Sequence, residues 1–129
     1  MARVLAVDPG DVRIGLALSD PTGLIARPLQ VIQHTKRSED ALLIVQKAEE
    51  FHADIILVGL PLDQDGNIGH QARKTLKLVQ ALRERTSLKI QTWDESGTTK
   101  RALEDGQASE MLDARAAAYM LQDFLDATE

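Results

Sequence analysis

The spacing of hydrophobic residues changes once along this chain of 129 residues, close to residue 38. Before that point the apolar residues form runs of strand length, which predict strands over residues 3–8, 13–19 and 29–33. The first run is apolar on both faces, as in a central strand that is covered from both sides. Turn-forming Pro, Gly and Asp residues separate the runs, so we expect a three-strand antiparallel meander. Pro28 stands just before the third run and favours an edge position for it.

After Ser38 the apolar residues recur at helical spacing in segments that alternate with strand-like runs. Ser38 is a suitable N-cap for a first helix that extends to Phe51. The elements predicted next are a strand over 55–58 that ends at Gly59, a helix over 68–85, a strand over 88–93, a short helix over 98–104 and a helix over 114–125. We therefore predict an α/β fold with a mixed five-stranded sheet, in which two parallel strands follow the meander and helices cover both faces. Residues 1–129 are expected to be a single domain.

The composition excludes several classes of protein. No apolar run approaches the ~20 residues that a membrane span needs, and no signal peptide is expected. Because cysteine is absent, neither a disulfide nor a thiolate metal site is expected, and the expected location is cytoplasmic. The formal net charge of −5 is unlike that of a general nucleic-acid binder, which is usually basic. Nucleic-acid contacts are therefore expected at local clusters of Lys and Arg.

Acidic residues stand where predicted strands end and where a predicted helix begins. Asp8 closes the first strand, Asp94 and Glu95 follow the fifth, and Asp113 opens the last helix. Each has a simpler explanation, as a turn residue, an exposed strand-end acid or a helix-capping residue. In open α/β sheets, ligands bind at the carboxyl ends of the strands, where these acids are expected to meet. Oxygen ligands without His or Cys favour Mg²⁺ or Mn²⁺, which support in-line displacement at phosphorus.

Segments that contain glycine are the second candidate feature. Gly59 and Pro61 follow a buried strand, where they either form a plain strand-to-helix connection or let a ligand approach the backbone. Gly10 and Gly15 follow Asp8 in a pattern that binds phosphate in some ATPases, although the pattern alone is weak. The three histidines have no mutual spacing typical of metal ligands, and we expect them in loops or at the surface: His34, His52 and His70.

Taken together, these segments resemble those of a known family. They occur in this order along the chain: Val7-Asp8-Pro9-Gly10 with Arg13-Ile14-Gly15, Val58-Gly59-Leu60-Pro61-Leu62 with Asp65-Gly66, Asp94-Glu95, and Asp113-Ala114-Arg115-Ala116-Ala117. The ordered set is similar to that of the YqgF family, also called RuvX, which is described as bacterial Holliday-junction resolvases and is linked to maturing the 5′ end of small-subunit ribosomal RNA. The resemblance covers nearly the whole chain. It implies an RNase H-like fold similar to that of RuvC, and a metal-dependent nuclease.

The resemblance also implies a role for individual residues. Asp8, Glu95 and Asp113 would be the catalytic residues and would hold Mg²⁺ or Mn²⁺. Asp94 would lie beside them as an accessory acid. The loop that lines the cleft would include Gly59 and Pro61.

The expected contacts to nucleic acid are Arg13, Lys100 and Arg101. This chain departs from the family pattern at Ser96, where arginine is usual, and over 106–112, where the segment is short and carries only one charged residue, an acid. Both changes remove positive charge that would hold a phosphate backbone. We expect Lys100 and Arg101 to compensate for that loss.

The leading hypothesis is a divalent-metal-dependent nuclease that processes the 5′ end of pre-16S rRNA. The alternatives are a resolvase that acts on branched DNA and a non-catalytic module that binds nucleic acid or protein. An ATP-binding relative of actin and the sugar kinases is less favoured, because those proteins need two such domains to hold the nucleotide. The expected partner is a nucleic acid rather than a membrane. The expected assembly is a monomer or a homodimer, and a two-fold dimer would suit a resolvase.

Overall fold

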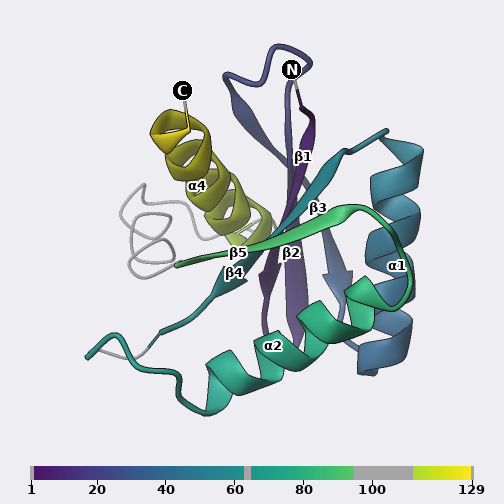
Figure 1. The fold of residues 1–129 in the computed structure, drawn as a ribbon, viewed down its shortest axis with the longest axis vertical. Coiled ribbons are helices and arrows are strands. Elements are labelled where there is room, and N and C mark those ends of the chain that lie inside the picture. The colour runs from purple at the N-terminus through teal and green to yellow at the C-terminus, as the bar shows by residue number, and fades with distance from the viewer. Residues whose placement is uncertain (1, 63–64, 95–111, 129) are drawn as a thin grey trace.

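A five-stranded sheet forms the centre of the computed structural model, which describes residues 2–62, 65–94 and 112–128 (Figure 1). The strands are β1 (Val4–Pro9), β2 (Arg13–Ser19), β3 (Ala26–Gln33), β4 (Ile55–Leu60) and β5 (Lys89–Asp94). Their order across the sheet is β3-β2-β1-β4-β5. The first three strands pair antiparallel, whereas β4 pairs parallel with both β1 and β5. The prediction of a meander followed by two parallel strands is confirmed.

Helices cover both faces of this sheet. On one face lie α1 (Arg37–Glu50) and α2 (His70–Arg83), and on the other lies α4 (Leu112–Ala127) (Figure 1). Alternation along β1 explains why both faces can be covered, since successive side chains of a strand point to opposite sides. Leu5 and Val7 belong to the core beneath α1 and α2, whereas Val4 and Ala6 belong to the core beneath α4. The predicted α/β architecture with helices on both faces is therefore confirmed.

Several predicted element boundaries are wrong in detail, those of β4 and α1 among them. Gly59 lies inside β4, which continues to Leu60, rather than directly after the strand. α1 begins at Arg37 with Lys36 as its N-cap, so Ser38 lies in the first turn and does not cap the helix. The carboxylate of Asp40 instead accepts a hydrogen bond from the backbone N–H of Thr35 at 3.1 Å. This contact joins the segment before α1 to the first turn of the helix. The helix therefore begins before Ser38, which the local sequence indicates as its cap.

The third strand is longer than predicted and includes Pro28. Because β3 is an edge strand, the missing N–H of proline does not have to remove a ladder hydrogen bond. The pairing of β2 with β3 shifts register between Leu16 and Ala17, opposite this part of the strand. The predicted edge position is confirmed, and the helix predicted over 98–104 lies outside the described residues. In the part of the chain that the structure describes, no helix is long and apolar enough to cross a membrane.

Candidate functional site

Asp8 lies at the carboxyl end of β1, where its Cα pairs with that of Gly15 on β2. Val4 and Ala6, two and four positions earlier, belong to the core beneath α4. The period of two along the strand therefore places Asp8 on the α4 face of the sheet. Asp8 is half-buried, so it lies at the border between this core and solvent.

The first turn of α4 packs directly on Gly15. A Cβ built on Gly15 would overlap the carbonyl group of Asp113 and would lie 2.7 Å from the backbone nitrogen of Ala114. Only a residue without a Cβ allows the helix to approach the strand this closely. Since Asp8 pairs with Gly15 and Asp113 covers it, two of the predicted acids are neighbours of the same glycine. The structure thus brings together residues from the two ends of the chain.

Arg13 extends this cluster on the same face of β2. Its Nε donates a hydrogen bond to Oδ2 of Asp113 at 2.9 Å, and the two side chains are 53% and 30% exposed. An ion pair in such a solvent-exposed position stabilises a fold by ~1 kcal/mol or less. Its main consequence is positional, because it restrains a carboxylate that stands in the first turn of a helix.

Strands β4 and β5 continue the sheet on the other side of β1, and residues on both contribute to its α4 face. Gly59 pairs with Trp93, whose ring meets that of Phe124 on α4 edge to face at a centroid separation of 5.3 Å. Gly59 is buried, and Pro61 follows the end of β4 and is half-buried. Asp94 also lies at the carboxyl end of its strand, but alternation after Trp93 assigns it to the opposite face of the sheet from Asp8.

Three of the predicted residues lie outside the described residues: Glu95, Lys100 and Arg101. Within residues 2–62, 65–94 and 112–128, no three side chains of His, Cys, Asp or Glu are grouped closely enough to hold a metal ion. Of the three acids predicted as ligands, Asp8 and Asp113 lie within the described residues, both beside Gly15.

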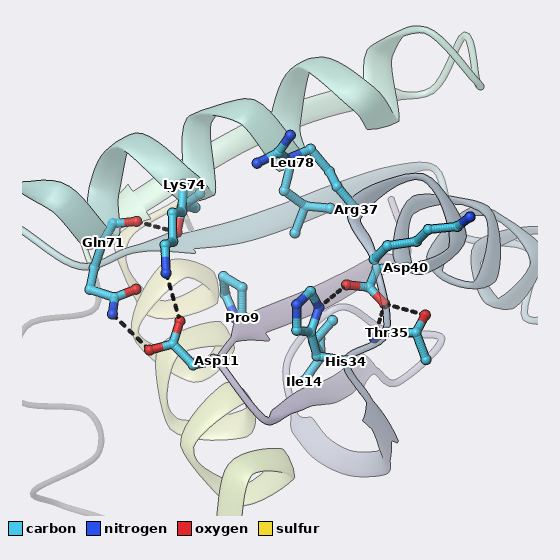
Figure 2. A pocket seen from close by; sticks show the side chains of 13 residues that line it. Pro9, Asp11, Ile14, His34, Thr35, Arg37, Asp40, Gln71, Lys74 and Leu78 are labelled. Atoms are coloured by element: carbon cyan, nitrogen blue, oxygen red, sulfur yellow. Dashed lines mark hydrogen bonds and ion pairs between the residues drawn. The ribbon is translucent and has the colours of Figure 1, made fainter.

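A second polar cluster lies on the α1 and α2 face and was not predicted. The Nδ1 atom of His34 and a carboxylate oxygen of Asp40 are in hydrogen-bond contact, and the side chain of Asp40 is only 3% exposed. Both residues line a cavity of about 360 Å³ (Figure 2). The sequence predicts His34 only as a loop or surface residue and does not pair it with Asp40. A His six residues before such an acid is a weak sequence signal, because the contact depends on how the chain turns between them.

Asp11 lies across the same cavity from this pair (Figure 2). The hydrogen bond that it accepts from Nε2 of Gln71 at 2.8 Å, together with the nearby ammonium group of Lys74, holds the pKa of Asp11 below its ordinary value of 3.8. The lowered pKa favours the charged carboxylate, which pairs with the ammonium group of Lys74 at 3.5 Å.

Comparison with known proteins assigns the chain to a family. A family model described as "RuvX: Holliday junction resolvase" matches residues 2–127. The chain belongs to the RuvX family. Among curated relatives, a protein of Desulforamulus reducens is 36% identical over 96% of this chain and 96% of its own, and one of Methylocella silvestris is 40% identical over 96% of this chain and 82% of its own. Both are named "Putative pre-16S rRNA nuclease". The family is therefore one of nucleases.

Solved structures agree with this family at the level of the fold. RuvC of Thermus thermophilus, solved in complex with a Holliday junction, matches with a TM-score of 0.63 and 16% identity over 98% of this chain and 95% of its own. A fowlpox virus resolvase in complex with Holliday junction DNA matches with a TM-score of 0.63 and 8% identity over 98% of both chains. These similarities identify the fold of this RuvX member as RNase H-like, as the sequence resemblance implies.

Proposed function

We propose that this protein is a divalent-metal-dependent nuclease that hydrolyses phosphodiester bonds at the 5′ end of pre-16S rRNA. The observation that carries the proposal is the position of Asp8 and Asp113 on either side of Gly15, at the carboxyl end of β1. That end of an open α/β sheet is where ligands bind. The names of the curated relatives support ribosomal RNA as the substrate.

The carboxylates of Asp8 and Asp113 suit Mg²⁺ or Mn²⁺, because both ions prefer oxygen ligands. Glu95 is the third ligand in this proposal. Trp93 stands on the α4 face, and Glu95 is two residues further along the sequence. When bound, such ions lower the pKa of a water molecule and neutralise charge that develops on the phosphate.

Other residues of the chain orient the ligands and hold the substrate in this proposal. Arg13 restrains Asp113 through its Nε, and its exposed guanidinium also carries positive charge toward an approaching phosphate. Gly59 and Pro61 line the cleft beside β1, and Asp94 contributes negative charge at the strand end as an accessory acid. Lys100 and Arg101 bind the phosphate backbone beyond the cleaved bond.

A resolvase of branched DNA is the second candidate function. The description of the matching family model favours it, and the RuvC and fowlpox resolvases that share the fold were solved with Holliday junctions. An ATP-binding role has less support, because the first turn of α4 covers Gly15 of the glycine pattern and leaves no room there for a phosphate. In the leading proposal, residues 1–129 act as one nuclease domain in the cytoplasm, as a monomer or a homodimer.

The test is cleavage of two labelled substrates, an rRNA precursor with additional 5′ sequence and a four-way DNA junction. Each is incubated with Mg²⁺, with Mn²⁺ and with a chelator. Asp8→Asn should abolish cleavage, whereas Asp126→Asn should not, because Asp126 is exposed at the far end of α4. Cleavage of the junction alone would replace the leading proposal by the second one. Cleavage that persists in Asp8→Asn would remove Asp8 from the mechanism.

A further inference from the structure

The cavity of about 360 Å³ on the α1 and α2 face lies at the same end of the sheet as Asp8. Three segments surround it: the turn over residues 9–11, the connection over residues 34–36 with the first turn of α1, and α2 over residues 71–78 (Figure 2). Because Pro9 lines the cavity and directly follows Asp8, the cavity and the candidate nuclease site are on opposite faces of one strand end. A chain that crosses this end of the sheet can reach both.

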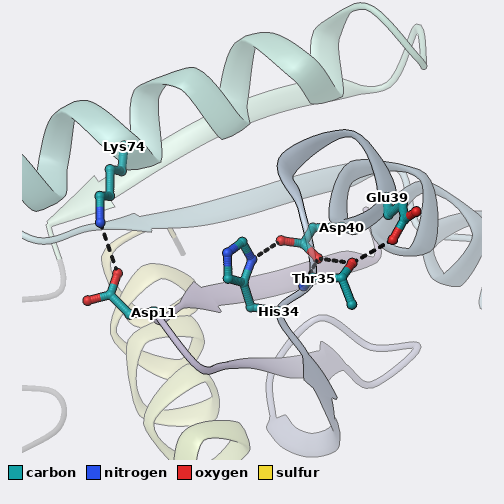
Figure 3. Close-up of polar contacts among 6 residues, drawn as sticks. All are labelled: Asp11, His34, Thr35, Glu39, Asp40 and Lys74. Atoms are coloured by element: carbon teal, nitrogen blue, oxygen red, sulfur yellow. Dashed lines mark hydrogen bonds and ion pairs between the residues drawn. The ribbon is translucent and has the colours of Figure 1, made fainter.

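One wall of the cavity carries an oriented imidazole. Nδ1 of His34 and one carboxylate oxygen of Asp40 are in hydrogen-bond contact, and the other oxygen of Asp40 accepts from the backbone N–H of Thr35. This contact fixes which nitrogen carries the proton in the neutral ring, so Nε2 is left as an acceptor. Figure 3 shows the outer ring nitrogen turned toward Asp11 and Lys74. The buried Asp40 thus presents a defined hydrogen-bonding atom of His34.

Basic and acidic side chains both line the cavity, with the basic ones in the majority. Lys36, Arg37 and Lys74 line it, against the two acids Asp11 and Asp40. Lys74 pairs with Asp11 at 3.5 Å, and Lys36 pairs with Glu39 at 3.7 Å. Arg37 has no ion-pair partner among the described residues, and its side chain extends toward Leu78 (Figure 2). The planar guanidinium of an arginine in this position is available to donate two hydrogen bonds to two oxygens of one phosphate.

The floor of the cavity is apolar. Pro9, Ile14 and Leu78 form it, and Ile14 and Leu78 also belong to the core beneath α1 and α2. A free inorganic anion would gain nothing from such a floor, whereas a ligand with a flat apolar part would bury surface on it. The volume falls in the range of ~300–1,000 Å³ typical of small-ligand sites, at its lower end.

We propose that this cavity binds one ribonucleotide of the RNA chain, with its phosphate on Arg37, its base or sugar on the apolar floor and a ribose hydroxyl donating to Nε2 of His34. A 2′-hydroxyl is the group by which a protein distinguishes RNA from DNA at a given site. The inference rests on the proposed function, because it takes the nucleotide to belong to the substrate. It adds a site that selects RNA while the acids on the opposite face cleave the chain.

The first experiment measures binding of uridine 5′-monophosphate, its 2′-deoxy analogue and inorganic phosphate to the full chain in chelator, by calorimetry. The same measurements on the Asp8→Asn variant show whether the candidate nuclease site contributes to this binding. We expect the ribonucleotide to bind more tightly than phosphate alone and about fivefold more tightly than the deoxynucleotide, the value of one hydrogen bond of ~1 kcal/mol. Equal binding of all three would overturn the proposal.

Two variants with a matched control assign the contacts. Arg37→Ala should weaken ribonucleotide binding at least about tenfold, as expected for the loss of a charged hydrogen bond, whereas Arg73→Ala should not, because Arg73 is exposed on α2 and does not line the cavity. His34→Asn keeps a donor near the position of Nδ1 for Asp40 but removes Nε2, so it should abolish the preference for ribose without unfolding the protein. A ribose preference that survives in His34→Asn contradicts the assignment of His34.

A further comparison tests whether the bound nucleotide belongs to the RNA substrate or is a free nucleotide. It also distinguishes failure of this inference from failure of the nuclease proposal. A short RNA oligonucleotide that competes with uridine 5′-monophosphate in the wild type but not in Arg37→Ala supports a substrate nucleotide. Binding of the free nucleotide without competition by RNA overturns that assignment. If metal-dependent cleavage occurs but no nucleotide binds in the cavity, only this inference fails. If the nucleotide binds but no substrate is cut, only the nuclease proposal fails.

Discussion

Gly15 and Asp113 are in direct backbone contact, with the carbonyl group of Asp113 in the space that a Cβ on Gly15 would fill. This contact sets the distance between α4 and β2, and hence the position of Asp113 relative to Asp8 on the neighbouring strand. A glycine within a strand usually weakens it, because it loses more conformational entropy and has no side chain to pack. Here the close approach of a helix explains its presence.

Replacing this glycine should therefore disturb both the fold and the site. Gly15→Ala should lower the free energy of unfolding by ~1–3 kcal/mol, as is typical of an overpacked core, and should reduce cleavage more than the lost stability explains. Gly69→Ala is the control, because nothing lies within 4 Å of a Cβ built there. Urea unfolding and cleavage assays measure the two effects. Wild-type stability in Gly15→Ala would show that the helix can shift without cost.

Two aspartates of α4, Asp113 and Asp126, should differ sharply in their importance for cleavage. Asp113→Asn should reduce cleavage by more than ~100-fold, since replacing residues that only orient metal ligands already costs ~10–100-fold. Asp126→Asn should stay within about twofold, although it also removes a charge from the same helix. Cleavage rates at saturating Mg²⁺ test this. Similar rates for both variants would exclude Asp113 as a ligand.

Arg13 should affect substrate binding more than stability. Because its ion pair with Asp113 is exposed, Arg13→Gln should change the free energy of unfolding by less than ~1 kcal/mol. If Arg13 also contacts phosphate, the salt dependence of RNA binding should fall by about one unit of slope, because one fewer counterion is released. Arg27→Gln, at an exposed position on β3, is the control. An unchanged slope in Arg13→Gln would show that Arg13 does not contact phosphate and acts only by restraining Asp113.

The carboxyl group of Asp11 should titrate below the ordinary range in the folded protein. The hydrogen bond from Gln71 and the charge of Lys74 both lower its pKa, so folding favours the charged form. The resulting stabilisation is present above the ordinary pKa of 3.8 and is lost as the pH falls through the lower pKa of the folded state. Gln71→Ala should raise this pKa toward 3.8, and Lys77→Ala, further along α2, should not. Carboxyl chemical shifts during an acid titration measure it.

The sequence by itself determined the elements and the type of sheet. Alternation over 13–19 and the fully apolar run before Asp8 predicted β2 and a central β1, and helical spacing predicted α1, α2 and α4. These patterns are local, since each reflects which face of one element is buried, so they can be recognised without knowing what covers that face. The position of acids at the ends of the elements was visible for the same reason.

Tertiary structure alone decided which of these residues meet. The contact of Gly15 with Asp113, the ion pair from Arg13 and the pair of His34 with Asp40 depend on how α4 and α1 pack on the sheet. Alternation also separated Asp94 from Asp8, although both stand at strand ends. A sequence pattern gives the face on which a residue lies, but the register and the distance between elements arise from packing of many side chains at once. The cavity beside His34, formed where three segments converge, could not be predicted for that reason.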